Sequence, residues 1–431
     1  MNGVVFLKVL IVSHNVFSKT ESMGKTLEGY FKDFDSNELA QFYIHSQIPT
    51  SKICKNYYRI TDKDAIKSIL GFKAGKVFTE NDIRTSRNDS RTDIGVTASI
   101  YQRARKRTPL VYLARNLWWK LSHWNNKALQ KWLDEFEPDC VFFASGDYAF
   151  MYDIARKIAV SRDIPLYVSC MDDYYFYNKN SDSLLGRFQH KIFIKTVNRT
   201  MSYAKKIFCI CDKMSADYSQ LFKKKCITIH TPTSISDIAP GKDDEKTRKI
   251  CYLGNLGYQR DKQLIEIGRV LRERNFNPNH IDVYSSESRQ EILGGMIENN
   301  GIVFHGSVGS KEVQDLMKNS LAVIHTESFD KKIRQCVKYS VSTKIADSLS
   351  SGTCIFAYGP EEIASISYLK QSNAAICCVK SDDLETKLCE LINDCGVRKK
   401  VIGNALGLAR KNHLPERTPK IIRKEIFYQE Q

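Results

Sequence analysis

The stretch VSTKIADSLSSGTCIFAYG, residues 341–359, predicts a loop, a helix, a glycine stop and a buried strand. Ser342 or Thr343 can cap the helix by accepting backbone N–H bonds, and Gly352 ends it before the β-prone residues 354–357. A helix start of this kind presents unpaired N–H groups and the positive end of the helix dipole. The segment therefore predicts an α/β unit with an anion site at the helix start.

Two charged side chains make this helix start more specific. Lys344 adds a cation to it, and Asp347 lies one turn further along, on the same side as Lys344. Backbone amides and a lysine suit phosphate oxygens, whereas a carboxylate suits ribose hydroxyls. The combination fits a diphosphate that carries a sugar. An ordinary capped helix packed on a sheet is the alternative interpretation.

The run STKIADSLSSG, residues 342–352, resembles the nucleotide-sugar segment of GT-B glycosyltransferases of the GT4 kind. The resemblance implies two Rossmann-like, doubly wound α/β domains facing across a cleft, with this segment in the second domain. It implies that Ser342, Thr343 and Lys344 bind the donor diphosphate, and that Asp347 takes the position of the ribose-binding carboxylate, more often Glu in that family. It also implies a retaining, metal-independent transfer from a nucleotide-sugar. A weaker resemblance extends over nearly the whole chain.

Length and composition agree with two globular domains. A chain of 431 residues is too long for one ordinary core, and its 42% hydrophobic and 26% charged residues exclude a disordered chain. The net charge of +16, from 65 Lys and Arg against 49 Asp and Glu, favours an anionic partner. Nucleic acid, an anionic membrane and a phosphorylated substrate all meet that description.

The cysteine pattern and the start of the chain indicate a cytoplasmic protein. The thirteen cysteines are odd in number and lack spaced pairs, which indicates reduced thiols. Neither they nor the carboxylates have metal-site spacing, so no metal and no separate cofactor are expected. The apolar run 4–12 is interrupted by Lys8 and lacks a cleavage pattern, and no stretch is long enough to span a bilayer.

Alternating buried strands and helices predict the domain boundaries. The first Rossmann-like domain, on the acceptor side, is expected over residues 1–235. A charged stretch with Pro and Gly over 236–248 is the expected linker, and the nucleotide-sugar domain is expected over 249–412. The resemblance implies that the last segment, 413–431, forms a helix that returns to the first domain.

A helix opens at residues 24–26, GKT, after the first buried strand. A strand that feeds this sequence into a helix resembles a phosphate-binding P-loop, but Lys19 stands where the full motif has glycine. The GT-B resemblance instead places Ser22, Met23 and Gly24 in an acceptor-side loop close to the point of sugar transfer. A plain helix N-terminus is the third interpretation.

Two adjacent carboxylates, Asp172 and Asp173, follow the predicted strand 165–170. They lie at its carboxyl end, where ligands bind in open α/β sheets. Carboxylates accept hydrogen bonds from sugar hydroxyls, and one of them could remove the acceptor proton. Asp172 or Asp173 is therefore the predicted catalytic residue. The alternative is that Asp172 caps the following loop or helix.

Three further residues are predicted to bind the donor. Arg260 and Lys262 lie in a glycine-bearing loop after the first strand of the second domain, and the resemblance implies that one of them holds the diphosphate. Glu327 follows a later strand and resembles the first acidic donor-binding position of the family. The alternative for Arg260 and Lys262 is that they are surface cations on a first helical turn. The alternative for Glu327 is a loop cap or an ion pair with Lys331 or Lys332.

Region 101–124 combines basic side chains with Trp118, Trp119 and Trp124 and with leucines at helical spacing. Such a helix is typical of proteins that lie peripherally on an anionic membrane surface. A helix packed on the sheet with a solvated basic face is the alternative. No nucleic-acid-binding module is recognised around it, so no nucleic-acid partner is expected.

Together these features predict a glycosyltransferase, EC 2.4, that moves a sugar from a nucleotide-sugar to a glycan or lipid-linked acceptor in bacterial surface polysaccharide synthesis. Two other classes stay open. A P-loop kinase or sulfotransferase is indicated by residues 24–26, and a non-catalytic anion- or membrane-binding protein is indicated by the net charge alone.

Overall fold

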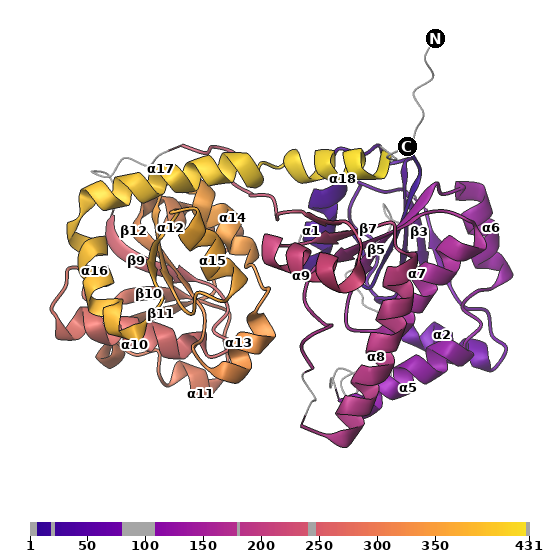
Figure 1. The fold of residues 1–431 in the computed structure, drawn as a ribbon, viewed down its shortest axis with the longest axis horizontal. Coiled ribbons are helices and arrows are strands. Elements are labelled where there is room, and N and C mark those ends of the chain that lie inside the picture. Colours follow the sequence, from indigo (N-terminus) through magenta and orange to yellow (C-terminus); the bar gives the residue numbers. More distant parts are fainter. Residues whose placement is uncertain (1–6, 19–21, 80–107, 179–181, 240–246, 428–431) are drawn as a thin grey trace, which may run out of the picture. The chain divides into compact units, whose positions relative to one another are not determined.

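The computed structural model describes residues 7–18, 22–79, 108–178, 182–239 and 247–427, and it contains two α/β units (Figure 1). Unit 1 comprises Met1–Ile229 and Thr418–Gln431, and unit 2 comprises His230–Arg417. Each unit has its own, almost entirely parallel sheet with helices on both faces. The predicted class, α/β with two doubly wound domains, is confirmed.

The sheet of unit 1 has the strand order β4-β3-β2-β1-β5-β6-β7-β8, and only the pairing of β3 with β4 is antiparallel. Its strands are β1 (Val9–Ser13), β2 (Leu39–Tyr43), β3 (Asn56–Arg59), β4 (Lys76–Phe78), β5 (Cys140–Ser145), β6 (Leu166–Cys170), β7 (Lys206–Cys209) and β8 (Cys226–Thr228). Strands β1, β5 and β6 are buried at every position, because helices cover both faces of the sheet.

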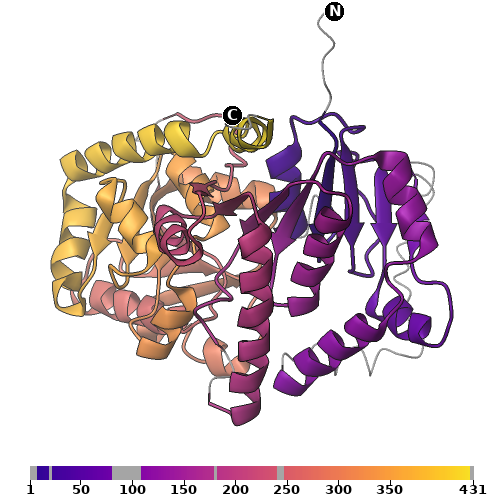
Figure 2. The same cartoon turned by 45° about the vertical axis from the view of Figure 1, so that its right-hand side comes forward.

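The helices of unit 1 are α1 (Ser22–Phe31), α2 (Asp62–Ile69), α5 (Pro109–Leu121), α6 (Lys127–Phe136), α7 (Ala149–Ser161), α8 (Leu184–Tyr203), α9 (Asp212–Phe222) and α18 (Arg417–Phe427). Neighbouring side chains of β5 show how they divide between the two faces. Phe142 meets Phe31 of α1 edge-on, whereas Phe143 meets Tyr152 of α7. Helix α8 runs beside α7 (Figure 2).

The sheet of unit 2 is entirely parallel, with the order β11-β10-β9-β12-β13-β14. Its strands are β9 (Thr247–Leu253), β10 (Ile281–Tyr284), β11 (Ile302–Gly306), β12 (Ser320–Thr326), β13 (Cys354–Tyr358) and β14 (Ile376–Cys378). The chain adds strands outward from β9 on one side and then returns to add β12 on the other. This reversal between β9 and β12 is the topological switch point, where open α/β sheets bind ligands.

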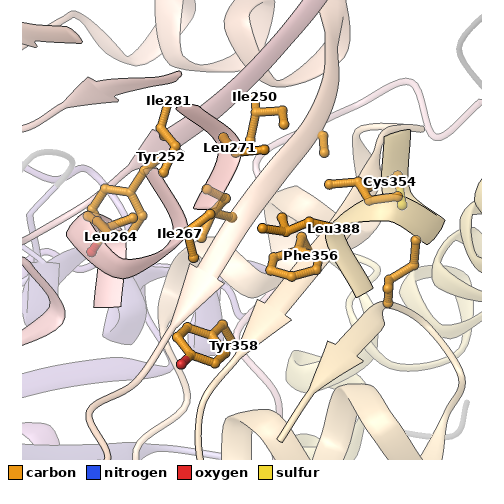
Figure 3. Close-up of a cluster of buried hydrophobic side chains, with 14 of the residues drawn as sticks. Ile250, Tyr252, Leu264, Ile267, Leu271, Ile281, Cys354, Phe356, Tyr358 and Leu388 are labelled. Carbon is orange, nitrogen blue, oxygen red and sulfur yellow. The ribbon is translucent and has the colours of Figure 1, made fainter. Parts of the chain in front are cut away.

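The helices of unit 2 are α10 (Arg260–Glu273), α11 (Gln290–Leu293), η3 (Glu298–Asn300), α12 (Ser310–Asn319), α13 (Lys331–Val337), α14 (Thr343–Ser350), α15 (Ala364–Gln371), η4 (Ser381–Asp383), α16 (Leu384–Asn393) and α17 (Cys395–Asn412). One face of β13 packs Phe356 against α10 and α16 in the cluster of Figure 3. The opposite face packs Ile355 with Leu349 of α14. The quoted stretch 341–359 thus supplies both the capped helix and the strand.

The chain passes between the units near His230 and again near Arg417. After Ile229 it is held to the end of α17, because the Thr233 N–H donates to the His413 carbonyl at 2.8 Å. Residues 230–239 therefore belong to unit 2, and the division lies a few residues before the expected one at 235. Part of the expected linker, 240–246, lies outside the described residues.

Helix α18 packs on unit 1 through apolar and charged contacts. Ile422 and Ile426 are buried in the same core cluster as the β1 side chains. Glu425 forms an ion pair with Lys206 at 2.9 Å, and Arg423 pairs with Glu38 at 2.7 Å. The last described segment of the chain is thereby part of the first unit's core.

The approach of α10 to residues 300 and 301 depends on the absence of a side chain at Gly268. A Cβ there would lie 2.3 Å from the Asn300 carbonyl oxygen and 2.7 Å from that of Gly301, and backbone atoms cannot yield cheaply. We expect Gly268→Ala to lower the free energy of unfolding by about 2–3 kcal/mol. Gly403→Ala is the matched control, because its Cβ would meet nothing within 4 Å and alanine favours α17 by roughly 1 kcal/mol. Equal thermal unfolding midpoints of the two variants would contradict this prediction.

Candidate functional site

Unit 2 contains a cavity of about 390 Å³ at the carboxyl edge of its sheet. Its walls are formed by the ends of β9, β10 and β12 and by the start of α14. The cavity therefore lies at the switch point between β9 and β12. Serine hydroxyls, backbone groups and two cationic side chains, Arg260 and Lys344, supply its polar surface.

The start of α14 forms one wall of the cavity, with Ser342, Thr343 and Lys344 all on the lining. Ser342 is the N-cap, and its Oγ accepts the Lys344 N–H at 3.3 Å. Partial desolvation lowers the pKa of Lys344, an effect that the nearby Asp347 carboxylate opposes. Helix N–H groups and an ammonium on one wall make an anion-binding surface.

Asp347, one turn into α14, is held by the segment that enters unit 2. Its Oδ1 accepts the Ser234 N–H at 2.7 Å and the Thr233 hydroxyl at 2.9 Å, and the exposed Ser234 hydroxyl lies 2.9 Å from Oδ2. The carboxylate is not part of the cavity lining. The structure therefore assigns Asp347 a contact that the sequence pattern did not indicate, one that fixes α14 to residues 233–234.

Arg260 and Glu327, predicted separately, form one buried ion pair. Arg260 Nη2 lies 2.9 Å from both carboxylate oxygens of Glu327, and its Nε donates to the Thr326 carbonyl at 3.2 Å. The Glu327 side chain is 0% exposed. Burial raises the pKa of Glu327 although Arg260 opposes it. Burial acts to lower the pKa of Arg260, but Glu327 together with the neighbouring Tyr252 and Tyr258 raises it overall. The ion pair of Glu327 is thus with Arg260, and not with Lys331 or Lys332 as in the alternative interpretation.

Of the residues near this cavity, Lys262 was predicted to bind the donor and His325 was not, and the structure places them the other way round. Lys262 is exposed and does not line the cavity. His325, which the sequence analysis did not single out, does line it, and its Nε2 lies 2.9 Å from Ser365 Oγ and 3.8 Å from Glu327. Burial, helped by Arg260, lowers the pKa of His325 to about 3, so the ring is neutral near pH 7. The sequence did offer one signal for this residue, since a histidine near the carboxyl end of a buried strand lies where ligands bind in α/β sheets.

The two carboxylates after β6 have different surroundings. Asp173 is 5% exposed, and its Oδ1 accepts the N–H groups of Tyr175 and Phe176 and the Tyr218 hydroxyl at 2.8 Å. Asp172 is exposed, and its Oδ1 accepts the Asp173 N–H at 2.9 Å. Asp173 thus shapes the loop, whereas the Asp172 side chain lies at the surface of the carboxyl edge.

Helix α1 begins at Ser22, and Met23 and Gly24 lie in its first turn. A Cβ on Gly24 would lie 2.5 Å from the Val16 carbonyl oxygen, so glycine lets α1 approach the loop after β1 closely. Lys19, on which the P-loop comparison depends, lies outside the described residues. Beyond β1, His14 is half-buried and stacks on Tyr148, and desolvation lowers its pKa to about 4.

Helix α5 turns its tryptophan face inward. Trp119 is 1% exposed, donates from Nε1 to Asp62 at 2.8 Å and stacks on Phe150, and Trp124 is also buried. Trp119 and Trp124 are therefore core side chains, and the prediction that they lie on a membrane surface is wrong. The exposed apolar residues of the helix are Leu110, Leu117 and Leu121. Residues 101–107 of this region lie outside the described part of the chain.

Two features are absent from the described residues. Within these ranges, no three His, Cys, Asp or Glu side chains come together as metal ligands. None of the described helices is both long and apolar enough to cross a bilayer.

Comparison with solved structures shows which fold this geometry belongs to. No protein-family model and no curated protein sequence matches the chain. Similar solved structures include an α,α-trehalose-phosphate synthase (UDP-forming) from Burkholderia xenovorans in complex with glucose-6-phosphate, with 10% identity over 97% of this chain and 100% of that one and a TM-score of 0.58. Anabaena Alr3699/HepE in complex with UDP has 11% identity, coverage of 97% and 99%, and a TM-score of 0.58. WaaG, a glycosyltransferase involved in lipopolysaccharide biosynthesis, has 12% identity, coverage of 98% and 100%, and a TM-score of 0.56. These likenesses show the GT-B fold over nearly the full length.

The neutral, buried His325 makes stability depend on pH. Its folded-state pKa of about 3 lies below the ordinary value of 6.5, so the unfolded chain binds the additional proton and stability is lost as pH falls below 6.5. From pH 7 to pH 5 we expect this histidine to cost about 2 kcal/mol. His325→Gln should lose correspondingly less stability over that range in urea unfolding. Parallel pH profiles for the two proteins would contradict the assignment.

The buried pair of Arg260 and Glu327 is expected to be strongly coupled. Glu327→Leu or Arg260→Met alone should cost about 3–5 kcal/mol, because each leaves a buried charge without its partner, whereas the double variant Arg260→Met with Glu327→Leu should recover most of that loss. The exposed pair Lys131 and Glu135 is the control, with an expected coupling below about 1 kcal/mol. Additive losses in the Arg260 and Glu327 double-mutant cycle would refute the coupling.

Proposed function

We propose that the protein is a glycosyltransferase that transfers a sugar from a nucleotide-sugar donor to a saccharide acceptor. The observation that carries the proposal is the cavity at the switch point of unit 2, walled by the start of α14 and Lys344. It combines an anion-binding wall with enough volume for a nucleotide in a chain of GT-B fold. The similar structures support it, since two of them hold UDP or a sugar phosphate.

In this proposal the donor diphosphate binds the N–H groups at Ser342, Thr343 and Lys344, with the Lys344 ammonium beside it. Arg260 uses Nε and Nη2 for Glu327 and Thr326, and its Nη1 can donate to a phosphate oxygen. These groups would stabilise the charge that develops on the departing nucleoside diphosphate, so the transfer needs no metal ion. Lys262, which lies outside the cavity, is the weaker candidate of the basic pair.

The ribose is proposed to bind Asp347. Of the groups that this carboxylate holds, the Ser234 hydroxyl is exposed, and a ribose hydroxyl could replace it without unpairing Thr233. Glu327, fixed by Arg260 at the end of β12, is proposed to orient the donor sugar. A carboxylate held by a bidentate guanidinium keeps a defined direction, which suits hydroxyl recognition.

The acceptor is proposed to bind at the carboxyl edge of the unit 1 sheet. Asp172 is exposed there and is the candidate for orienting or deprotonating the acceptor hydroxyl, whereas Asp173 holds the loop that carries it. The start of α1, at Ser22, Met23 and Gly24, is the proposed contact near the point of transfer. Retention of anomeric configuration is part of the proposal through the GT4 resemblance.

A lipid-linked acceptor in bacterial surface polysaccharide synthesis is the proposed biological setting, with the protein on the cytoplasmic face of the membrane. The exposed Leu110, Leu117 and Leu121 of α5 support a peripheral contact, because apolar side chains next to cations suit an anionic bilayer surface. The net charge of +16 would strengthen such a contact.

Donor binding is tested by thermal shift with UDP-, GDP-, CMP- and dTDP-sugars without added metal. A sugar nucleotide at a hundred times its dissociation constant should stabilise the protein by about 2.7 kcal/mol. We expect Lys344→Ala to lose this response, because the variant lacks the cation at the diphosphate, and the exposed Lys399→Ala on α17 to keep it. A response to none of the sugar nucleotides, or an undiminished response in Lys344→Ala, would refute the proposal.

A further inference from the structure

A second cavity, of about 420 Å³, lies in unit 1 between helices α5, α7 and α8. These three helices pack against one another, and α7 lies directly on strands β5 and β6 of the sheet (Figures 1 and 2). The lining also includes Trp124, which follows α5. No residue is shared with the cavity of unit 2, so this is a separate candidate site.

Five cationic side chains from all three helices line this second cavity, against one carboxylate. The carboxylate, Asp153, lies 3.2 Å from Nη2 of the neighbouring Arg156 and forms an ion pair with it. The cations are Lys120 from α5, Arg156 and Lys157 from α7, and Lys195 and Arg199 from α8.

Most of this positive charge is not compensated within the protein. In the ranges that the structure describes, Lys120, Lys195 and Arg199 have no carboxylate within ion-pair distance. Arg156 Nε is buried and meets no hydrogen-bond acceptor among the same residues. Cations gathered on one lining repel each other, and a bound anion would relieve that repulsion.

The floor of the cavity is aromatic. Trp119 stacks on Phe150 with ring centroids 4.7 Å apart, and the Lys157 ammonium lies 6.0 Å from the centre of the Trp124 ring. Apolar walls lower the local dielectric constant, so a cation there attracts an anion more strongly than it would in open water. The rings also give apolar surface for an uncharged part of a ligand, such as a sugar ring or a glycerol backbone.

We propose that this cavity binds a phosphate-bearing ligand. A phosphomonoester carries close to two negative charges and a phosphodiester carries one, and both offer strong acceptor oxygens that suit ammonium and guanidinium groups from three helices. A carboxylate has only two oxygens, so it can accept hydrogen bonds from fewer of these cations. The proposal is independent of the proposed donor site, because it rests on residues of unit 1 alone.

The chain supplies its own reporter for this site. All four tryptophans of the sequence, residues 118, 119, 124 and 132, lie in unit 1, and two of them line the cavity. We expect titration of the full-length protein with inorganic pyrophosphate, at fixed ionic strength, to give a saturable change in tryptophan fluorescence. The Lys344→Ala variant should show the same change, which separates this site from the donor cavity.

The decisive variant is Lys195→Gln with Arg199→Gln. Both side chains are exposed on α8, so the substitution leaves the core intact, and loss of two charge-assisted contacts should weaken binding by about ten-fold or more. Lys420→Gln with Lys424→Gln is the matched control, since it removes the same charge at the same spacing from the exposed face of α18. The control should bind pyrophosphate like the wild type.

Sedimentation with vesicles identifies the source of the phosphate. If phosphatidylglycerol vesicles, but not phosphatidylcholine vesicles, bring down the wild type and the control while the α8 variant stays in solution, the ligand is an anionic lipid headgroup. If the α8 variant loses only pyrophosphate binding, the ligand is a soluble phosphorylated molecule. The proposal is overturned if no saturable fluorescence change occurs, or if the α8 variant and the control bind pyrophosphate equally.

Discussion

The reversal of strand order between β9 and β12 is the constraint on which the unit 2 site depends. A parallel sheet must be covered on both faces, so ligands can approach only its edges. Helix α10, which follows β9, packs on the face that includes Phe356, whereas α14, after β12, packs on the face that includes Ile355. Helices that leave neighbouring strands toward opposite faces open a space at the carboxyl edge. The cavity and the N–H groups of α14 occupy that space.

Electrostatics at the floor of this cavity follow from burial. Glu327 is fully buried, and only the bidentate contact with Arg260 makes its charge tolerable there. The same guanidinium acts with burial to lower the pKa of His325, so the ring adds no further positive charge. The strong cations of the cavity lining are therefore Arg260, already shared with Glu327, and Lys344 at the helix start. An anion in the cavity is therefore attracted most strongly to the start of α14.

Much of the fold could be predicted from the sequence, because strands buried on both faces read as short continuous apolar runs. Residues 140–145 and 354–357 are of this kind, and the Ser342 cap followed from local side-chain chemistry. Long-range pairing could not be predicted in the same way. Arg260 and Glu327 are 67 positions apart, and each alone had an ordinary surface interpretation. Asp347 and its partner Ser234 are 113 positions apart, so the local sequence around either residue did not indicate this contact.

Helix α5 shows why a charge and aromatic pattern does not decide which face of a helix is buried. Its leucines recur at helical spacing with tryptophans among them, and the partly buried Asp62 selects the Trp119 face for the core, because its carboxylate accepts the indole N–H there. Leu110, Leu117 and Leu121 are left at the surface.

The orientation of α5 also determines which of the cations behind the net charge of +16 can attract an anion strongly. Cations such as Lys131, which pairs with Glu135 in open solvent, are screened and attract little. Lys157 lies over the ring of Trp124, where water is excluded from one side. With Trp119 of α5 turned inward and Trp124 buried just after the helix, this region provides the low-dielectric surface that lets a few of the chain's many cations act on an anion.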